Sequence, residues 1–237
     1  MFERLAVDAA IVAGFGVGAY KMGALDWKGT LAASLLGLAV LELGGLYPFL
    51  ALLTFALLGA LATKYRYDEK RERKVAQSNN GVRSWGNVLG NGLPVLIFLI
   101  IERLSMLDVF WAATFSAIAT VNGDTLASEL GKVLGKSPRL ITNLKPAKPG
   151  TNGAVSIEGE LFALLGSIVI ALFALPLTEL KAQMFLAVTL GGFIGANLDS
   201  LIGATLENKR LIDNNATNFL AGLFGGLIGA GIFYVLT

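Results

Sequence analysis

The chain has 237 residues, of which 54% are apolar and 15% charged, and its mean hydropathy is +0.66. These values exclude an ordinary soluble domain and predict an integral membrane protein, while a net charge of +2 argues against nucleic acid as a partner. The chain has no Cys and no His, which excludes disulfides, thiolate nucleophiles, imidazole acid–base chemistry and zinc bound by either residue. Any chemistry must therefore use carboxylates, Lys, Arg, hydroxyls, amides or a hard cation.

Eight apolar runs are long enough to cross a hydrocarbon core of about 30 Å as helices. They lie at about residues 5–22, 28–45, 47–63, 86–101, 106–121, 159–177, 183–202 and 216–236. The first run is interpreted as a retained helix, because Asp8 interrupts it and no small-residue cleavage site follows before Lys21. The predicted fold is all-α: a polytopic transmembrane helical bundle of about eight spans (seven to nine) in a single membrane domain, residues 1–237.

The polar connections are predicted to alternate between the two sides of the membrane. One set consists of residues 21–27, 64–85, 122–158 and 203–215, which with their flanking residues hold 16 of the 19 Lys and Arg side chains. Positive residues near spans stay in the cytoplasm, so this set is predicted to be cytoplasmic and to form the site. The division is then three N-terminal spans (1–63), a basic loop (64–85) that touches anionic headgroups, and a catalytic core (86–237).

The motif N-x-D-[ST]-L occurs twice, as NGDTL at 122–126 and as NLDSL at 197–201. The first copy follows the fifth apolar run and the second closes the seventh. Because both runs cross in the same direction, Asp124 and Asp199 are expected at a similar depth near the cytoplasmic surface. Two carboxylates flanked by amides and hydroxyls suit Mg²⁺, which takes oxygen ligands from one or two carboxylates and from substrate phosphates.

The first motif also offers further polar groups if its helix continues. Thr125 and Glu129 then share one face, as do Asp124 and Ser128. The predicted catalytic residues and metal ligands are Asp124, Glu129 and Asp199, supported by Asn122 and Asn197. The alternative is that these acids only cap helices at the membrane surface. Ionisable groups near hydrocarbon are costly and usually functional, which favours a site.

The segment KPAKPGTNGAVS, residues 145–156, is predicted to bind phosphate. Its two Pro and two Gly residues disfavour regular structure and leave backbone N–H groups free near the start of a helix. The candidate phosphate-binding residues are Lys145, Lys148, Thr151, Asn152 and Ser156. It is not a Walker A sequence. A flexible basic connection that obeys the positive-inside rule is the alternative interpretation.

The segment GVRSWGNVLGNG, residues 81–92, leads into the fourth apolar run. Arg83 is suited to clamp a phosphate, and Asn91 is expected to face the site. Asn residues in a bundle also form interhelical hydrogen bonds, which is the alternative for Asn91.

The last connection and the last two runs carry two more patterns. Asp213 and Asn218 precede or begin the final run and are secondary candidates for substrate binding, while Asn214 or Asn215 is the expected helix cap. Pairs of Gly four residues apart predict close helix packing. These pairs are Gly191/Gly195, Gly222/Gly226 and Gly225/Gly229.

The blocks NGDTLASELGK, KPGTNGAVS, GANLDSLIGATLE and GVRSWGNVLGNG together resemble the integral membrane family that includes the phytyl-phosphate kinase of plants and cyanobacteria. The resemblance runs from about Arg83 to the C-terminus, with the blocks in the same order. It implies transfer of a phosphoryl group from a nucleoside triphosphate, typically CTP, to an isoprenoid monophosphate, which gives the diphosphate. A remote similarity to dolichol kinases and CDP-diacylglycerol synthases is limited to membrane architecture, and the H-G-G block of the synthases is absent.

The residue chemistry agrees with this implied activity. A phosphate monoester is already ionised at neutral pH and needs no His base, so positioning and charge neutralisation remain the main tasks. The expected protein is a CTP-dependent prenyl (phytyl) phosphate kinase-like transferase that uses Mg²⁺ and keeps the lipid tail in the bilayer. A lipid nucleotidyltransferase and, with less support, a transporter built on the paired Asp motifs stay as alternatives. The sequence leaves open a homo-oligomer.

Overall fold

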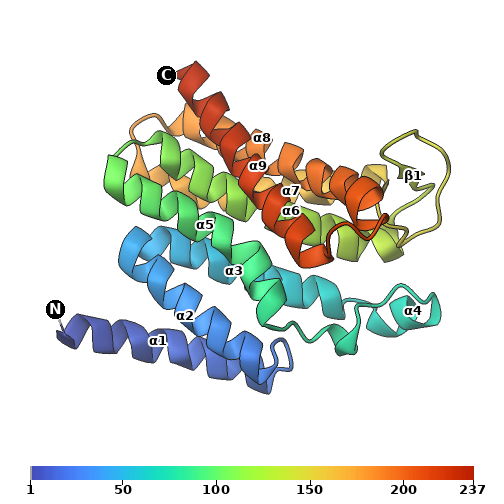
Figure 1. The fold of residues 1–237 in the computed structure, drawn as a ribbon, viewed down its shortest axis with the longest axis horizontal. Helices are drawn as coiled ribbons and strands as arrows, with labels where there is room; N and C mark the ends of the chain where they lie inside the picture. The colour runs from blue at the N-terminus through green and yellow to red at the C-terminus, as the bar shows by residue number, and fades with distance from the viewer. Residues whose placement is uncertain (1) are drawn as a thin grey trace.

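The computed structural model describes residues 2–237, and most of them are helical (Figure 1). The long helices are α1 (Phe2–Lys21), α2 (Trp27–Gly44), α3 (Leu46–Lys64), α5 (Trp85–Ser105), α6 (Val109–Leu134), α7 (Ile157–Ala174), α8 (Lys181–Ile202) and α9 (Asn214–Leu236). The short elements are α4 (Tyr67–Glu72), the 3₁₀ turns η1 (Asn79–Gly81) and η2 (Leu175–Leu177), the π-helical turn η3 (Gly203–Glu207), and the strands β1 (Arg139–Leu140) and β2 (Ala154–Val155). The all-α prediction is confirmed.

Five of the long helices, α3, α5, α7, α8 and α9, are long and apolar enough to cross a membrane by length and composition. The other three long helices, α1, α2 and α6, correspond to the remaining predicted runs but do not reach that criterion. The predicted polytopic helical bundle is therefore confirmed. Of the eight long helices within residues 2–237, five are long and apolar enough to cross a membrane.

Short polar side chains start several of these helices. Asp26 accepts a hydrogen bond from Gly29 N at the start of α2, over 2.6 Å. Asp213 accepts one from Ala216 N at the start of α9, over 2.9 Å. The expectation that Asn214 or Asn215 caps α9 is wrong, because the chain is still extended at Asp213 and only its carboxylate reaches the free N–H.

α6 lies at the centre of the bundle. Every residue from 112 to 123 is buried, and α3, α5, α7, α8 and α9 pack around this helix. The buried stretch includes Ser116, Thr120 and Asn122, which would be unfavourable against lipid but are enclosed here by protein. In Figure 1, α1 and α2 lie at one edge of the bundle and the C-terminal helices at the other, with α3 and α5 between them.

Glycines allow α8 and α9 to approach each other and α6 closely. A Cβ added at Gly195 or at Gly225 would overlap Thr120 of α6, and Gly195 lies next to Gly225. A Cβ added at Gly191 would likewise overlap Gly229, so these two glycines also lie against each other. The packing role predicted for the G-x-x-x-G pairs in these two helices is confirmed.

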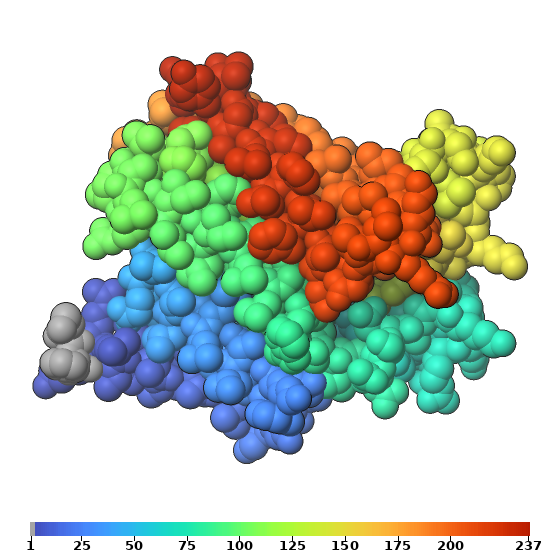
Figure 2. All heavy atoms as spheres, in the orientation of Figure 1, coloured from blue at the N-terminus to red at the C-terminus, as the bar shows by residue number. Residues whose placement is uncertain are grey.

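The four long polar connections gather at one end of the bundle, which we call the loop end (residues 22–26, 65–84, 135–156 and 203–213). The backbone of Arg83 bonds to Ala24 and Asp26, which joins the first two connections. Figure 2 shows the segment around β1 (yellow) and the α4 segment (teal) at this end, with the orange chain between α8 and α9 between them in this view. The prediction that these stretches lie together is confirmed.

We predict that Gly225→Leu destabilises the protein by about 1–3 kcal/mol or more, because its side chain must displace Thr120 and the backbone of α8. Thermal unfolding of the purified protein in detergent measures the change. The matched control is Gly231→Leu on the same helix, where an added Cβ meets no atom within 4 Å. Equal midpoints for the two variants would contradict the packing argument.

Candidate functional site

A polar pocket of about 300 Å³ opens at the loop end between α6, α7, α8 and the chain from 149 to 156. Its acidic lining residues come from four elements: Asp124 of α6, Glu160 of α7, Asp199 of α8 and Glu207 of η3. Because α6, α7 and α8 are separate segments of the chain, the pocket exists only in the folded bundle. We refer to it as the polar pocket.

One face of α6 forms a wall of the polar pocket. Asp124, Ser128 and Lys132 follow one another at intervals of four residues, with Ala127 and Gly131 between them. These intervals place the five residues on a single helical face. The wall therefore carries a carboxylate, a hydroxyl and an ammonium group in order toward the end of the helix.

The two Asp residues of the repeated motif meet in the polar pocket. Asp124 and Asp199 both line it, and their charges interact with each other and with that of Glu207. Such a concentration of carboxylates suits a hard cation with oxygen ligands. Within residues 2–237, however, no group of three or more acidic side chains is arranged to hold a metal ion.

Side chains from α9 hold two of these carboxylates. With the Asn218 amide turned so that its nitrogen faces the acid, Nδ2 lies 3.2 Å from Oδ2 of Asp199. Thr217 Oγ1 donates to Oε2 of Glu207 over 3.0 Å. The π-helical turn that carries Glu207 is fixed by a bond from Asn208 N to Gly203 O. Glu207 therefore approaches the pocket from a widened helical turn, a feature often found at functional sites.

The chain from 149 to 153 covers the polar pocket. Thr151, Asn152 and Gly153 line it, and the N–H groups of Asn152 and Gly153 donate no hydrogen bond within the part of the chain that the structure describes. Gly153 has a φ of +78°, and a Cβ there would overlap Ala204, so this position requires glycine. The loop thus brings free donors to the acidic pocket.

Part of this loop is more regular than expected. β1 and β2 pair antiparallel, with Arg139 opposite Val155 and Leu140 opposite Ala154. Lys145 and Lys148, in the connection between the two strands, are exposed and lie outside the pocket lining. The Pro and Gly residues interrupt the hairpin only between its strands, which is why the predicted absence of regular structure is wrong at Ala154.

The start of α7 completes the wall. Ser156 lines the pocket and caps α7 by accepting from Gly159 N over 3.1 Å. Asn197 of the second motif donates to Oε2 of Glu160 over 2.9 Å, which connects α8 to α7. Ser156 was predicted to bind phosphate and Asn197 to support the predicted metal ligands, and both lie in the lining with these structural bonds already formed.

Glu129 has a different environment from the other two predicted metal ligands. It is buried, and its two oxygens each lie 2.7 Å from an ammonium nitrogen, one of Lys70 and one of Lys132. Lys70 is fully buried and also donates to the carbonyls of Ala62 and Thr63. Glu129 therefore joins α4 to α6 and does not line the pocket with Asp124, which differs from the predicted three-acid site.

Arg83 lies between the polar pocket and a second, apolar cavity. Its guanidinium is 5.6 Å from the Phe55 ring and packs against Gly59, beside the methyl group of Thr125. Burial lowers the pKa of the Arg83 guanidinium, and the negative charges of Glu129 and Asp124 act in the opposite direction. Arginine remains protonated in proteins, so this position supplies a fixed positive charge near Asp124.

The other predicted residues lie outside the polar pocket. Asn122 is fully buried and donates to Gly166 O over 2.8 Å, so it connects α6 to α7. Asn91 donates to Asn87 O and lines the apolar cavity. Asp213 is the exposed cap of α9. Substrate contact in the polar pocket is not supported for these three side chains.

The sequence of the chain matches the family model described as "Integral membrane protein DUF92" over residues 10–226. The chain belongs to this family. It is 35% identical over 235 residues to the uncharacterized membrane protein MJ0933 of Methanocaldococcus jannaschii, covering 98% of this chain and 96% of that protein. It is 32% identical over 207 residues to the uncharacterized membrane protein sll0875 of Synechocystis, covering 84% and 79%.

The DUF92 chain is also 29% identical over 212 residues to Protein VTE6, chloroplastic, of Arabidopsis thaliana, covering 86% of this chain and 64% of that protein. No solved structure matches. The family expected from the four sequence blocks is confirmed. This protein is accordingly an integral membrane protein with several apolar helices.

Sequence reasoning missed three charged groups of this DUF92 site. Lys132 was recoverable, because continuing the Asp124–Ser128 spacing by one more turn predicts it on the same face. Glu207 lies in the last polar connection, but its position in the pocket lining depends on the π-helical turn. Lys70 gave no local signal, since it reaches Glu129 from 59 residues away.

We predict that Lys70→Met destabilises the protein by about 3 kcal/mol, since it removes one of the two cations that pair with a buried carboxylate. Urea or thermal unfolding in detergent measures the loss. The matched control is Lys74→Met, at an exposed position of the same loop. The double variant Lys70→Met with Glu129→Gln is expected to recover part of the loss; a Lys70→Met variant as stable as the control would refute the role of the pair.

Proposed function

We propose that this protein transfers the γ-phosphoryl group of a nucleoside triphosphate, with CTP favoured, to a membrane isoprenoid monophosphate such as phytyl or another prenyl phosphate. The observation that carries the proposal is the meeting of Asp124 and Asp199, from two copies of one motif, in a single pocket beneath the loop 149–153. The pocket would face the cytoplasm, where nucleotides are found. The sequence similarity to VTE6 and the resemblance to the family that includes phytyl-phosphate kinase support the same activity.

The residues present fit Mg²⁺. Asp124 and Asp199 supply carboxylate oxygens from neighbouring helices, Glu207 adds negative charge beside them, and softer ligands are excluded because the chain has no Cys or His. Two carboxylates with the substrate's phosphates are the usual ligand set for this ion. When bound, Mg²⁺ supplies neutralisation of the charge on the phosphate oxygens. Glu129 is excluded from this set in the proposal, because two lysines already occupy its oxygens.

The triphosphate would lie against the α6 wall and the loop. Lys132 and Ser128 supply a cation and a hydroxyl on one side, and the free N–H groups of Asn152 and Gly153 supply donors on the other. Thr151 adds a hydroxyl to the same lining. Donors fixed before the substrate binds need no reorganisation when charge develops, which is the main contribution of a protein to phosphoryl transfer. Lys145 and Lys148 would act only at long range, by attracting the nucleotide to this end of the protein.

The acceptor needs no catalytic base. An oxygen of its ionised monophosphate attacks the γ-phosphorus, the bond from that phosphorus to the β,γ-bridging oxygen breaks, and the nucleoside diphosphate leaves with the bond's electron pair. Arg83 would hold the attacking phosphate, because it presents a positive fork near Asp124. Phosphoryl transfer then depends on holding two phosphates in line, which the absence of His does not impair.

We predict that Asp124→Asn and Asp199→Asn each lower kcat by about 10²–10³-fold or more, since each removes a charge directed at the reacting phosphates. The assay incubates purified protein and Mg²⁺ with each of the four nucleoside triphosphates and a set of prenyl monophosphates, then identifies the products. The matched control is Asp68→Asn in α4, an exposed acid outside the pocket, which should keep the wild-type rate. Wild-type rates in a folded Asp124→Asn variant would remove the metal assignment.

The products distinguish the proposed reaction from its nearest competitor. A kinase releases the nucleoside diphosphate and forms a prenyl diphosphate. A lipid nucleotidyltransferase with the same metal site releases pyrophosphate and forms a nucleotide-linked lipid. Pyrophosphate as the released product would overturn the kinase assignment while leaving the pocket as the active site.

A further inference from the structure

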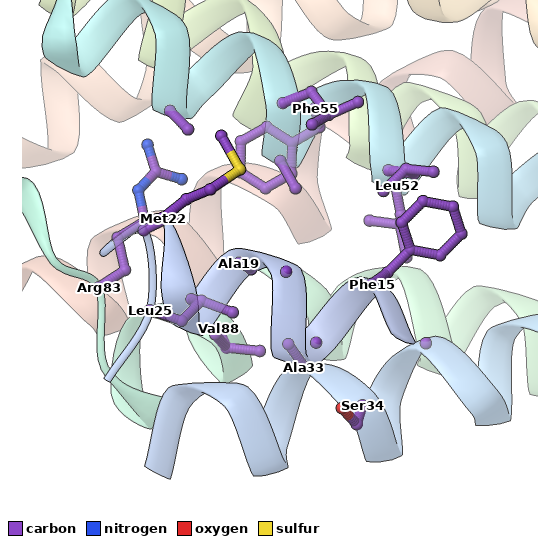
Figure 3. A pocket seen from close by; sticks show the side chains of 18 of the residues that line it. Phe15, Ala19, Met22, Leu25, Ala33, Ser34, Leu52, Phe55, Arg83 and Val88 are labelled. Atoms are coloured by element: carbon purple, nitrogen blue, oxygen red, sulfur yellow. The ribbon is translucent and has the colours of Figure 1, made fainter. Parts of the chain in front are cut away.

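A second cavity of about 300 Å³ lies between α1, α2, α3 and α5, outside the polar pocket. Most of its lining is aliphatic or aromatic, and except for Ser34 its polar residues lie at or near the loop end. Figure 3 shows Arg83 and Met22 at one end of this cavity, Phe15 and Leu52 at the other, and Ala19 and Ala33 between them. We call it the apolar cavity.

The two ends of the apolar cavity differ in polarity. Along α3 its lining extends from Phe49 to Lys64, which corresponds to about 20 Å of helix. At the loop end it has Asn87, Asn91 and the guanidinium of Arg83, while at the opposite end the rings of Phe15 and Phe49 lie 6.2 Å apart. A ligand with a polar head and a hydrocarbon tail matches this gradient in a single orientation.

The charge at the mouth specifies an anionic head. Within residues 2–237 the Arg83 guanidinium forms no salt bridge, although its backbone is fixed by bonds to Ala24 and Asp26. A half-buried guanidinium beside an apolar cavity is costly without an anion and binds phosphate through its fork of donors. The same side chain lies beside Thr125, one residue from Asp124 of the polar pocket.

We infer that the apolar cavity binds the hydrocarbon chain of the phosphorylated acceptor, with the acceptor phosphate at Arg83, and that the Phe15–Phe49 end sets the chain length. The inference rests on the proposed function, since it concerns the acceptor of that reaction. A head held at Arg83 is directed toward Asp124, and a tail in the apolar cavity remains among α1, α2, α3 and α5. A volume at the lower end of the usual range for ligand pockets suits one chain better than the two chains of a phospholipid.

Two substitutions change the length of the apolar cavity in opposite directions. Gly18 lines the cavity, and an added Cβ there meets no atom within 4 Å, so Gly18→Leu places a side chain in free space partway along it. Phe15→Ala removes the ring that helps close the far end. Gly231→Leu, in equally open space on α9, is the matched control for adding leucine to a helix.

The test measures kcat/KM with a series of prenyl monophosphates that differ by one isoprene unit. Gly18→Leu is expected to lower kcat/KM for the longest acceptors about tenfold relative to the shortest, in line with the discrimination that apolar pockets achieve. Phe15→Ala should move the preferred acceptor to a longer chain, and Gly231→Leu should leave the profile unchanged. Arg83→Gln should raise KM for the acceptor while KM for the nucleotide stays constant. An active enzyme whose length profile is the same in both cavity variants would overturn the inference and leave the proposed function standing.

A binding measurement separates failure of the inference from failure of the proposed function. A fluorescent prenyl monophosphate is bound to the purified protein and displaced by unlabelled prenyl monophosphate or by phosphatidic acid. Binding that Gly18→Leu weakens, without turnover in the wild type, would support the cavity and refute the kinase. Equal displacement by phosphatidic acid would identify a general site for anionic lipids and overturn the assignment, as would the absence of binding.

Discussion

The burial of residues 112–123 of α6 is the constraint on which the rest of the structure depends. A helix enclosed by five others needs no lipid-compatible surface, so it carries Ser116, Thr120 and Asn122 in its middle and acids and a lysine toward its end. Those polar groups in turn require close partners, which Gly195 and Gly225 provide by leaving room for Thr120. The packing therefore depends on both sets of residues: small residues of α8 and α9 make room for the polar residues of α6.

The same central position explains how the polar pocket is built. Only a helix in contact with α7, α8 and α3 at once presents Asp124 next to Asp199 on one side and close to Arg83 on the other. The buried Lys70–Glu129 pair fixes α4 against this helix just below the pocket. Burying a charged pair seldom adds stability overall, but it favours one arrangement of the loop end, and the nucleotide site proposed above would require such a fixed geometry.

The two cavities differ in the chemistry of their linings. The polar pocket collects carboxylates and backbone donors, the apolar cavity collects aliphatic and aromatic side chains, and Arg83 lies at their boundary. In the proposed reaction, the soluble nucleotide would bind at the loop end and the lipid acceptor in the apolar cavity. That assignment would account for a site at the helix ends, because the two substrates would arrive through different solvents.

Much of this arrangement follows from the sequence by itself. Apolar runs, Gly pairs and caps act over a few residues, so eight long helices, the α8–α9 contact and the gathering of the loops were predictable. The repeated Asp motif and its neighbouring sequence blocks indicated the family. Tertiary structure alone decided which charges face which cavity. Glu129 pairs with Lys70 instead of joining Asp124, Lys145 and Lys148 lie outside the pocket lining, and Glu207 lines the pocket from a π-helical turn. These outcomes depend on contacts between residues far apart in the chain. A buried charge needs a partner, and tertiary packing determines which residue is near enough to pair with it, so a local sequence pattern does not predict the pair.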